Sequence, residues 1–140
     1  MTTLNAGDSL TIRAPKVTRT TLALYAGASG DHNPVHIDTD ACAAVGIPDV
    51  FAHGMLSMAY LGRLLTDWVP QGRIRSFGVR FSAITPVNVT PVCTGTVAAV
   101  EDGLAHLDLA VTLPDGTVTL RGTAVVTALD PATSNDRTDT

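Results

Sequence analysis

One long apolar helix constrains the fold of this chain more than any other feature of its sequence. Residues 55–68 carry apolar side chains at helical spacing around most of the circumference, and Pro70 ends the segment. These side chains are Met55, Leu56, Met58, Ala59, Leu61, Leu64 and Leu65. We expect a helix of this kind to be buried on several sides, so the rest of the chain has to surround it.

The period of the apolar residues changes after this helix. Phe77, Val79 and Phe81 alternate with small or polar residues, which predicts a strand. The sequence Asp102-Gly103 is typical of a tight hairpin between two strands. Further strands are predicted over 92–100, 105–111 and 117–129. This order of elements predicts an α+β fold, in which an antiparallel sheet is wrapped around one long central helix.

The residues before the long helix predict shorter elements with clear ends. Residues 9–14 alternate weakly and indicate a first strand. Thr18 is a suitable N-cap for a helix that continues to Ala28 and is stopped by Gly30. Asp38 can cap a short helix that follows it. The loop between these two helices has the sequence GDHNPVHID and carries most of the reactive side chains.

The composition predicts one domain over residues 1–129, followed by a polar tail at 130–140. The net charge of −4 argues against a nucleic-acid partner, which would need a concentrated basic face. No segment has the pattern of a secretion signal or a membrane span, so we expect a cytoplasmic protein without a membrane partner. Charged residues make up only 16% of the chain, which favours burial of further surface in an oligomer.

The loop places a carboxylate and an imidazole five residues apart, with Asn33-Pro34 between them. Pro34 fixes its own φ and biases Asn33 away from helical angles, so a bend can bring Asp31 and His36 to one water molecule. Acid–base catalysis needs this geometry. The alternative is ordinary turn chemistry, in which the Asp31 carboxylate accepts from nearby backbone and His36 is a half-buried side chain.

The start of the long helix, His53-Gly54, is the second informative segment. Gly54 has no side chain, so a carbonyl oxygen can approach its N–H closely at the positive end of the helix. That arrangement would stabilise the oxyanion of a thioester whose α-carbon gains or loses a proton. An ordinary helix start, in which Gly54 only permits the turn, accounts for the same residues.

Other polar groups support weaker hypotheses. Ser57, one turn after the helix start, lies either in the same pocket or on the surface. The histidines and carboxylates lack the paired spacing of a zinc site, so we expect no metal. Nothing in the sequence around Cys42 would activate it as a nucleophile. The basic turn at 71–75 is either a contact for a phosphate or an acidic carrier, or a solvated edge.

Two segments together resemble a known family. Residues 25–38 (YAGASGDHNPVHID) and 52–56 (AHGML) are similar to the MaoC-like, (R)-specific enoyl-CoA hydratase family, also called hydratase 2. The later segments 79–81 (VRF) and 85–87 (TPV) resemble that family's strand after its central helix. The helix end at 66–68 (TDW) is similar to the B subunit of actinobacterial fatty-acid-synthase-II type 3-hydroxyacyl-thioester dehydratases.

The resemblance implies a hotdog fold, usually dimeric, with the substrate tunnel at the subunit interface and no cofactor. It implies that Asp31 and His36 hold a water molecule and move the protons, while the Gly54 N–H binds the thioester carbonyl. Asn33 would also shape the loop. The expected substrate-binding residues are Asn33, His53 and Ser57.

The activity implied by the resemblance is that of a lyase, which interconverts (3R)-3-hydroxyacyl and trans-2-enoyl thioesters of CoA or of acyl carrier protein. One alternative is a hotdog acyl-thioesterase, in which water attacks C1 rather than C3; the intact Asp31–His36 loop argues against it. Another alternative is one subunit of a heterodimeric dehydratase that needs a partner hotdog chain. In that case this chain is the active subunit, whereas a homodimer would pair it with a copy of itself.

Overall fold

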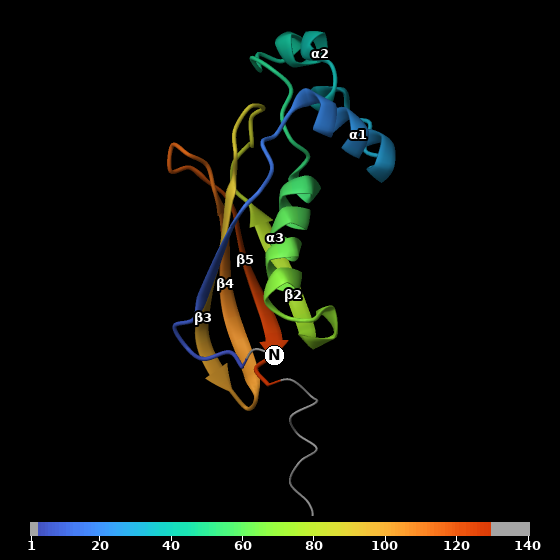
Figure 1. Ribbon diagram of the computed structural model, residues 1–140. Coiled ribbons are helices and arrows are strands. Elements are labelled where there is room, and N and C mark those ends of the chain that lie inside the picture. Colours follow the sequence, from blue (N-terminus) through green and yellow to red (C-terminus); the bar gives the residue numbers. More distant parts are fainter. Residues whose placement is uncertain (1–2, 130–140) are drawn as a thin grey trace, which may run out of the picture.

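The computed structural model describes residues 3–129, which form one antiparallel sheet, one long helix and several shorter helices (Figure 1). The strands lie in the order β1-β3-β4-β5-β2. Their bounds are β1 (Ser9–Arg13), β2 (Ile74–Phe81), β3 (Val92–Glu101), β4 (Leu104–Thr112) and β5 (Val118–Thr127). The helices are α1 (Arg19–Ser29), α2 (Thr39–Ala44) and α3 (Gly54–Trp68), with 3-10 turns η1 (Pro34–His36) and η2 (Gln71–Arg73). The polar tail predicted at 130–140 lies outside the described residues.

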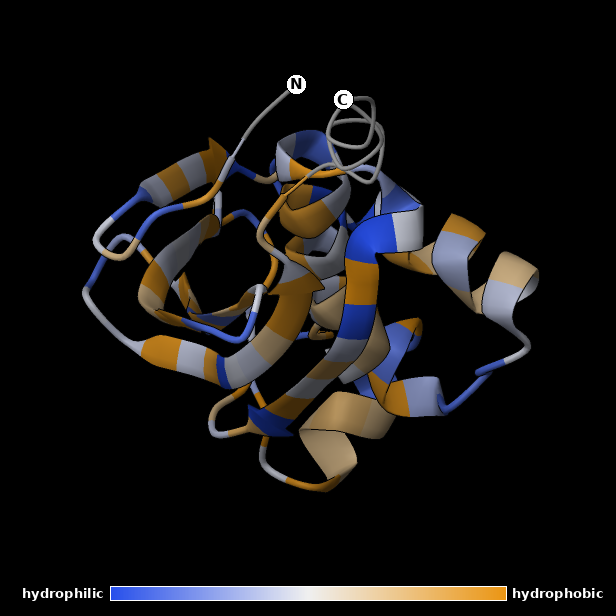
Figure 2. Cartoon of the chain, turned by 90° about the horizontal axis from the view of Figure 1, so that it is seen from below, coloured by the Kyte–Doolittle hydropathy of each residue, from blue (hydrophilic) through white to orange (hydrophobic). Residues whose placement is uncertain are grey.

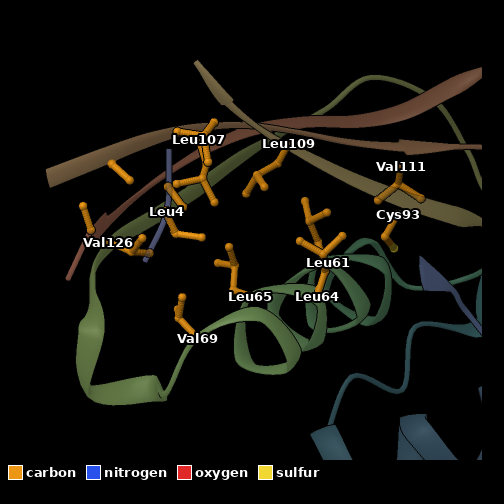
Figure 3. Close-up of a cluster of buried hydrophobic side chains, with 14 of the residues drawn as sticks. Leu4, Leu61, Leu64, Leu65, Val69, Cys93, Leu107, Leu109, Val111 and Val126 are labelled. Atoms are coloured by element: carbon orange, nitrogen blue, oxygen red, sulfur yellow. The ribbon is translucent and has the colours of Figure 1, made fainter. Parts of the chain in front are cut away.

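The sheet curves around α3, which contacts β1, β2, β3 and β4 (Figures 1 and 2). Leu61, Leu64 and Leu65 of α3 are completely buried and point toward the sheet (Figure 3). Leu107 and Val126 meet them from β4 and β5 within the same apolar cluster. The predicted α+β fold, a sheet wrapped around one central helix, is confirmed.

The alternation predicted for the strands after the helix is also confirmed. Ala105, Leu107, Leu109 and Val111 of β4 are buried, and the residues between them are more exposed. The same alternation of apolar and polar residues is visible along the curved strands in Figure 2. Asp102 and Gly103 have φ angles of 52° and 75° and form the predicted tight turn between β3 and β4.

The prediction that α3 is buried on several sides is wrong for the single chain. Met55 is 57% exposed, and Ala59, Arg63 and Thr66 continue an exposed stripe along the helix. Residues at this spacing lie on one side of a helix. Met55 and Ala59 made the circumference look uniformly apolar in the sequence, although they share a side with polar residues.

The shorter elements before α3 end where their capping residues predict. The Thr18 side chain accepts from the backbone N–H of Thr21 at the start of α1, and Gly30 ends the helix with a φ of 77°. Asp38 accepts from two backbone amides at the start of α2. Figure 1 shows α1 and α2 together at the end of the molecule where α3 begins.

A second apolar cluster joins these short elements to the start of α3. Its buried members include Leu22 of α1, Cys42 of α2 and Leu56 of α3, together with Val50 and Ala52 from the segment before α3. The loop between α1 and α2 is therefore held close to the first turn of α3, where the candidate site lies.

In the basic turn at 71–75, Arg73 differs from both interpretations of the sequence. Arg73 is only 3% exposed, and its guanidinium donates to the backbone carbonyls of Thr127 and Ala128. Arg73 therefore joins η2 to the end of β5, and Arg75 remains exposed. In the part of the chain that the structure describes, no helix has the length and apolar character needed to cross a membrane.

Candidate active site

The loop between α1 and η1 is shaped by hydrogen bonds from its own side chains. The Asp31 Oδ1 accepts from the backbone N–H of Asn33 at 3.2 Å, and the Asn33 Oδ1 accepts from that of Val35 at 3.3 Å. Pro34 then begins η1. These short-range bonds turn the chain sharply, so residues that are five apart in sequence come to face each other.

Asp31 and His36 are brought together as predicted. The Asp31 Oδ2 lies 3.9 Å from the His36 Nε2, which is too long for a direct hydrogen bond. A water molecule can bridge the two atoms by donating one hydrogen to each of them. The Asp31 side chain is 51% exposed and that of His36 is 10% exposed, so the pair is reached from the Asp31 side.

The tautomer of His36 follows from its other hydrogen bond. Its Nδ1 lies 2.7 Å from the backbone carbonyl of Phe51, and a carbonyl can only accept. The Nδ1 must therefore carry the proton in the neutral ring, which leaves a lone pair on the Nε2 that faces Asp31. The ring is thus oriented as a base toward the candidate water position.

His53, the N-cap residue of α3, lies behind this pair and is 1% exposed. Its Nε2 donates to the backbone carbonyl of Asp31 at 3.1 Å, and its ring stacks on that of His36 with centroids 3.9 Å apart. Burial lowers the pKa of His53, and the hydrogen bond to the Asp31 carbonyl opposes this effect. In the predicted set, His53 is the residue that packs against the site from the interior.

A pocket of about 280 Å³ opens at the first turn of α3. Gly54 is the first residue of the helix, and amides of a first turn have no carbonyl partner within their own helix. The pocket is lined by Phe51, Ala52, Gly54, Ser57, Phe81, Ala83, Ile84, Thr85 and Leu120. It is mostly apolar, with a helix terminus at one wall, as expected for a site that receives an acyl group.

Phe81, at the end of β2, covers the Gly54 wall of this pocket. A Cβ built on Gly54 would lie 2.9 Å from two ring carbons of Phe81, closer than real side chains approach. Phe81 is nevertheless 51% exposed, so its ring has room to move. The sequence marked Phe81 as a strand residue and as part of the VRF segment but not as a site residue, because its contact with Gly54 joins segments that are far apart in the chain.

Ser57 is placed in the pocket rather than on the surface. It is 3% exposed, and its Oγ lies 3.5 Å from the hydroxyl of Thr85. Thr85 was not predicted as a site residue; the only signal for it in the sequence was the similarity of the TPV segment to the family.

Asn33 is exposed and uses its side chain to cap η1, while Cys42 is buried and donates to the Val35 carbonyl. Burial raises the pKa of Cys42, which disfavours the thiolate that a nucleophile needs.

Asp31, His36 and His53 each place one possible ligand atom within 4.8 Å of the others. A histidine binds a metal in the plane of its ring, and stacked rings direct their nitrogens side by side rather than toward one point. One nitrogen of each ring is also used by a backbone carbonyl. This stacking supports the expectation of a metal-free site, which remains a prediction.

The fold has relatives of known structure. The (R)-hydratase from A. caviae superposes with a TM-score of 0.81 over 89% of this chain and 96% of that chain, at 23% identity. The ChsH1-ChsH2 complex from Mycobacterium tuberculosis gives a TM-score of 0.78 over 88% of this chain and 97% of that chain, at 26% identity. The chain is therefore a hotdog-fold protein with an Asp–His loop at the start of its central helix.

The sequence places the chain more narrowly. The family profile described as MaoC like domain matches residues 4–113, so the chain belongs to the MaoC-like domain family. The 3-hydroxyacyl-thioester dehydratase X of Mycobacterium tuberculosis is 34% identical over 110 residues, which cover 76% of this chain and 38% of that protein. The dehydratase Z of the same species is 32% identical over 92 residues, which cover 61% of each chain. This chain thus spans less than two thirds of the length of either dehydratase.

The narrower similarity of residues 66–68 to a dehydratase B subunit stays a prediction. A C-terminally truncated HadBC complex, a (3R)-hydroxyacyl-ACP dehydratase from Mycobacterium tuberculosis, superposes with a TM-score of 0.66 over 89% of this chain and 98% of that chain, at 16% identity. At that identity the likeness concerns the fold alone.

We predict that His53 makes the stability of the fold decrease in mild acid. Its pKa is lowered in the folded state, so the unfolded chain, with a value near 6.5, binds the proton at higher pH. Stability is therefore complete above pH 6.5 and falls as the pH decreases toward the folded value. His53→Phe removes this proton, so its melting temperature should fall less than that of the unmodified chain over the pH range just below 6.5. Parallel curves for the two proteins in that window would contradict the prediction.

Proposed function

We propose that this chain is a lyase that interconverts (3R)-3-hydroxyacyl and trans-2-enoyl thioesters by removing or adding water. The observation that carries the proposal is the pairing of two acceptors, the Asp31 Oδ2 and the His36 Nε2, around one water position. The pocket at the start of α3 supplies a place for the acyl group. The names of the relatives, (R)-hydratase and 3-hydroxyacyl-thioester dehydratase, support the same chemistry.

In the hydration direction, a water molecule donates one hydrogen to Asp31 and the other to His36. Its oxygen lone pair is then free to attack C3 of the enoyl thioester, as one of the two groups removes a proton. The C2=C3 electrons move toward the thioester oxygen, which becomes an enolate oxygen. Asp31 or His36 then returns a proton to C2 on the same face. Dehydration is the reverse, and the proton count of the pair is unchanged after either cycle.

The enolate oxygen is proposed to rest on the Gly54 N–H. This amide lies at the positive end of α3, where negative charge is stabilised without any rearrangement. Ser57 and Thr85 place hydroxyls in the same pocket, and they are proposed to contact the acyl group or the thioester. The carrier of the thioester, CoA or acyl carrier protein, would enter from the exposed side of Asp31.

We further propose that the chain works as a dimer, either with a copy of itself or with another hotdog subunit. β2 lies at the edge of the sheet, so one side of its backbone is open to pair with another strand. Phe81 and Ile84, near its end, are each 51% exposed, and Met55 beside Gly54 is 57% exposed. Apolar exposure at a sheet edge is typical of an interface. One related solved structure is that of a complex of two different chains, ChsH1 and ChsH2.

Light scattering of the purified chain tests the dimer. We expect a mass of about twice 14.5 kDa, or a monomer that becomes active only when a second hotdog subunit is added. A monodisperse, fully active monomer of 14.5 kDa would be incompatible with this proposal.

The first catalytic test uses Asp31→Asn and His36→Ala. Each should lower kcat by at least ~10²-fold, because general acid–base groups typically contribute ~10²–10⁴-fold. Asn at position 31 keeps an oxygen that can accept from the Asn33 amide, so the loop should keep its shape. The measurement is the loss of absorbance of crotonyl and longer enoyl thioesters on CoA and on acyl carrier protein. His106→Ala, on the outer side of β4, is the control and should keep its rate. Near-normal turnover in both loop variants would exclude Asp31 and His36 from catalysis.

The second catalytic test concerns the Gly54 amide. Gly54→Val keeps the amide N–H but adds a side chain where the thioester oxygen has to approach it, so kcat should fall by roughly 10²–10³-fold, the size of loss seen when one oxyanion donor is removed from a hydrolase. A new side chain at position 54 also displaces Phe81, so the substitution is repeated in a Phe81→Ala background, with Phe81→Ala alone as the reference. The loss should persist there if it comes from the amide. Full recovery of kcat in the double variant would assign the effect to Phe81 and remove Gly54 from the mechanism.

A further inference from the structure

Four rings make a continuous series of contacts that includes His36 of the proposed dyad. Tyr25 of α1 meets His53 edge to face, with centroids 4.7 Å apart and an interplanar angle of 64°. His53 stacks on His36 at 3.9 Å and 25°. His36 in turn meets Phe51 edge to face at 5.1 Å and 76°. The His36 ring thus contacts two other rings, those of His53 and Phe51.

His53 also has a polar contact with the other member of the dyad. Its Nε2 donates to the backbone carbonyl of Asp31 at 3.1 Å. One side chain therefore touches both Asp31, through its main chain, and His36, through its ring. His53 is 1% exposed, whereas the Asp31 side chain is 51% exposed, so His53 makes these contacts from the interior, away from the side on which the pair is open to solvent.

We propose that His53 is a positioning residue, which holds Asp31 and His36 at the separation that lets both accept from one water molecule. The proposal rests on the proposed function for its catalytic consequence. It changes the role expected from the sequence, where His53 was counted among the substrate-binding residues.

The two contacts explain why a histidine suits this position. A phenyl ring could stack on His36 but has no N–H for the Asp31 carbonyl, whereas an amide side chain has the N–H but no ring. A neutral imidazole supplies both. Neutrality matters, since a charged ring 3.9 Å from His36 would oppose the proton that His36 has to accept. Burial favours the neutral form of His53. Its Nδ1 has no hydrogen-bond partner among the described residues, so the ring is held by these two contacts and by Tyr25.

Three variants of His53 separate positioning from the other roles. His53→Phe keeps the stack, His53→Gln keeps an N–H donor, and His53→Ala keeps neither. We expect His53→Ala to lower kcat by about 10- to 100-fold, the size of effect that a misplacement near 1 Å produces, with KM changed by less than about twofold. The other two variants should lie between His53→Ala and the unmodified chain. His106→Phe is the matched control, since that histidine is on the outer side of β4.

A second readout does not depend on activity. The chain has only 4 histidines, so the ring nitrogens can be assigned by ¹⁵N NMR. In the unmodified chain, His36 should show a protonated Nδ1 and an unprotonated Nε2. His53→Ala should shift these signals toward a mixture of tautomers, because without the stacked ring the His36 imidazole can turn away from the Phe51 carbonyl that fixes its tautomer. His106→Phe should leave them unchanged.

The outcomes distinguish this proposal from the proposed function. Altered His36 signals in a chain without hydratase activity would support positioning and contradict the function. A raised KM with unchanged kcat would show that His53 contacts the substrate. Unchanged kcat, KM and His36 signals would show that His53 only fills space in the core. Either result overturns the proposal. If His53→Ala does not fold, His53→Phe and His53→Gln decide by the same criteria, since each retains one contact.

Discussion

The site depends on how α3 is held against the sheet. Leu61, Leu64 and Leu65 are completely buried, and each such side chain contributes roughly 1.5–3 kcal/mol when removed from water. This packing fixes the rotation and the height of the helix. A shift by one turn, about 5.4 Å, would separate Gly54 from Phe81 and His53 from the Asp31 carbonyl. The chemistry at the first turn is therefore determined by apolar contacts further along the helix.

The loop needs a second constraint, because its short-range hydrogen bonds set its shape but not its position. The cluster of Leu22, Cys42, Val50 and Leu56 supplies that position by joining α1, α2 and the start of α3. The Cys42 thiol also donates to the Val35 carbonyl, which ties α2 to η1. A small buried cysteine can therefore support the site without taking part in its chemistry.

Features that depend on neighbouring residues could be predicted from the sequence, whereas contacts between distant segments could not. The Thr18 and Asp38 caps and the Asp102-Gly103 turn follow from a few adjacent residues and were predicted correctly. Arg73 gave no sign that it would turn inward to the end of β5, because nothing near it indicates a buried carbonyl partner. Two other contacts were not predicted for the same reason. Phe81 covers Gly54, and His53 stacks on His36, and in both cases only the packing of the sheet and helix brings the segments together.

The sequence left two interpretations of Asp31 and His36 open: side chains that hold a turn, or a pair that transfers protons. The geometry is compatible with both at once. Asp31 uses its Oδ1 to hold the Asn33 amide and directs its Oδ2 toward His36. His36 uses its Nδ1 to hold the Phe51 carbonyl and directs its Nε2 back toward Asp31. Each side chain therefore has one polar atom that holds the backbone and one that faces the other side chain, where the proposed water would lie. A carboxylate and an imidazole suit this division, because both carry two polar atoms that point in different directions. A serine has a single polar atom, which cannot lie at two positions, and a lysine ammonium cannot accept a hydrogen bond.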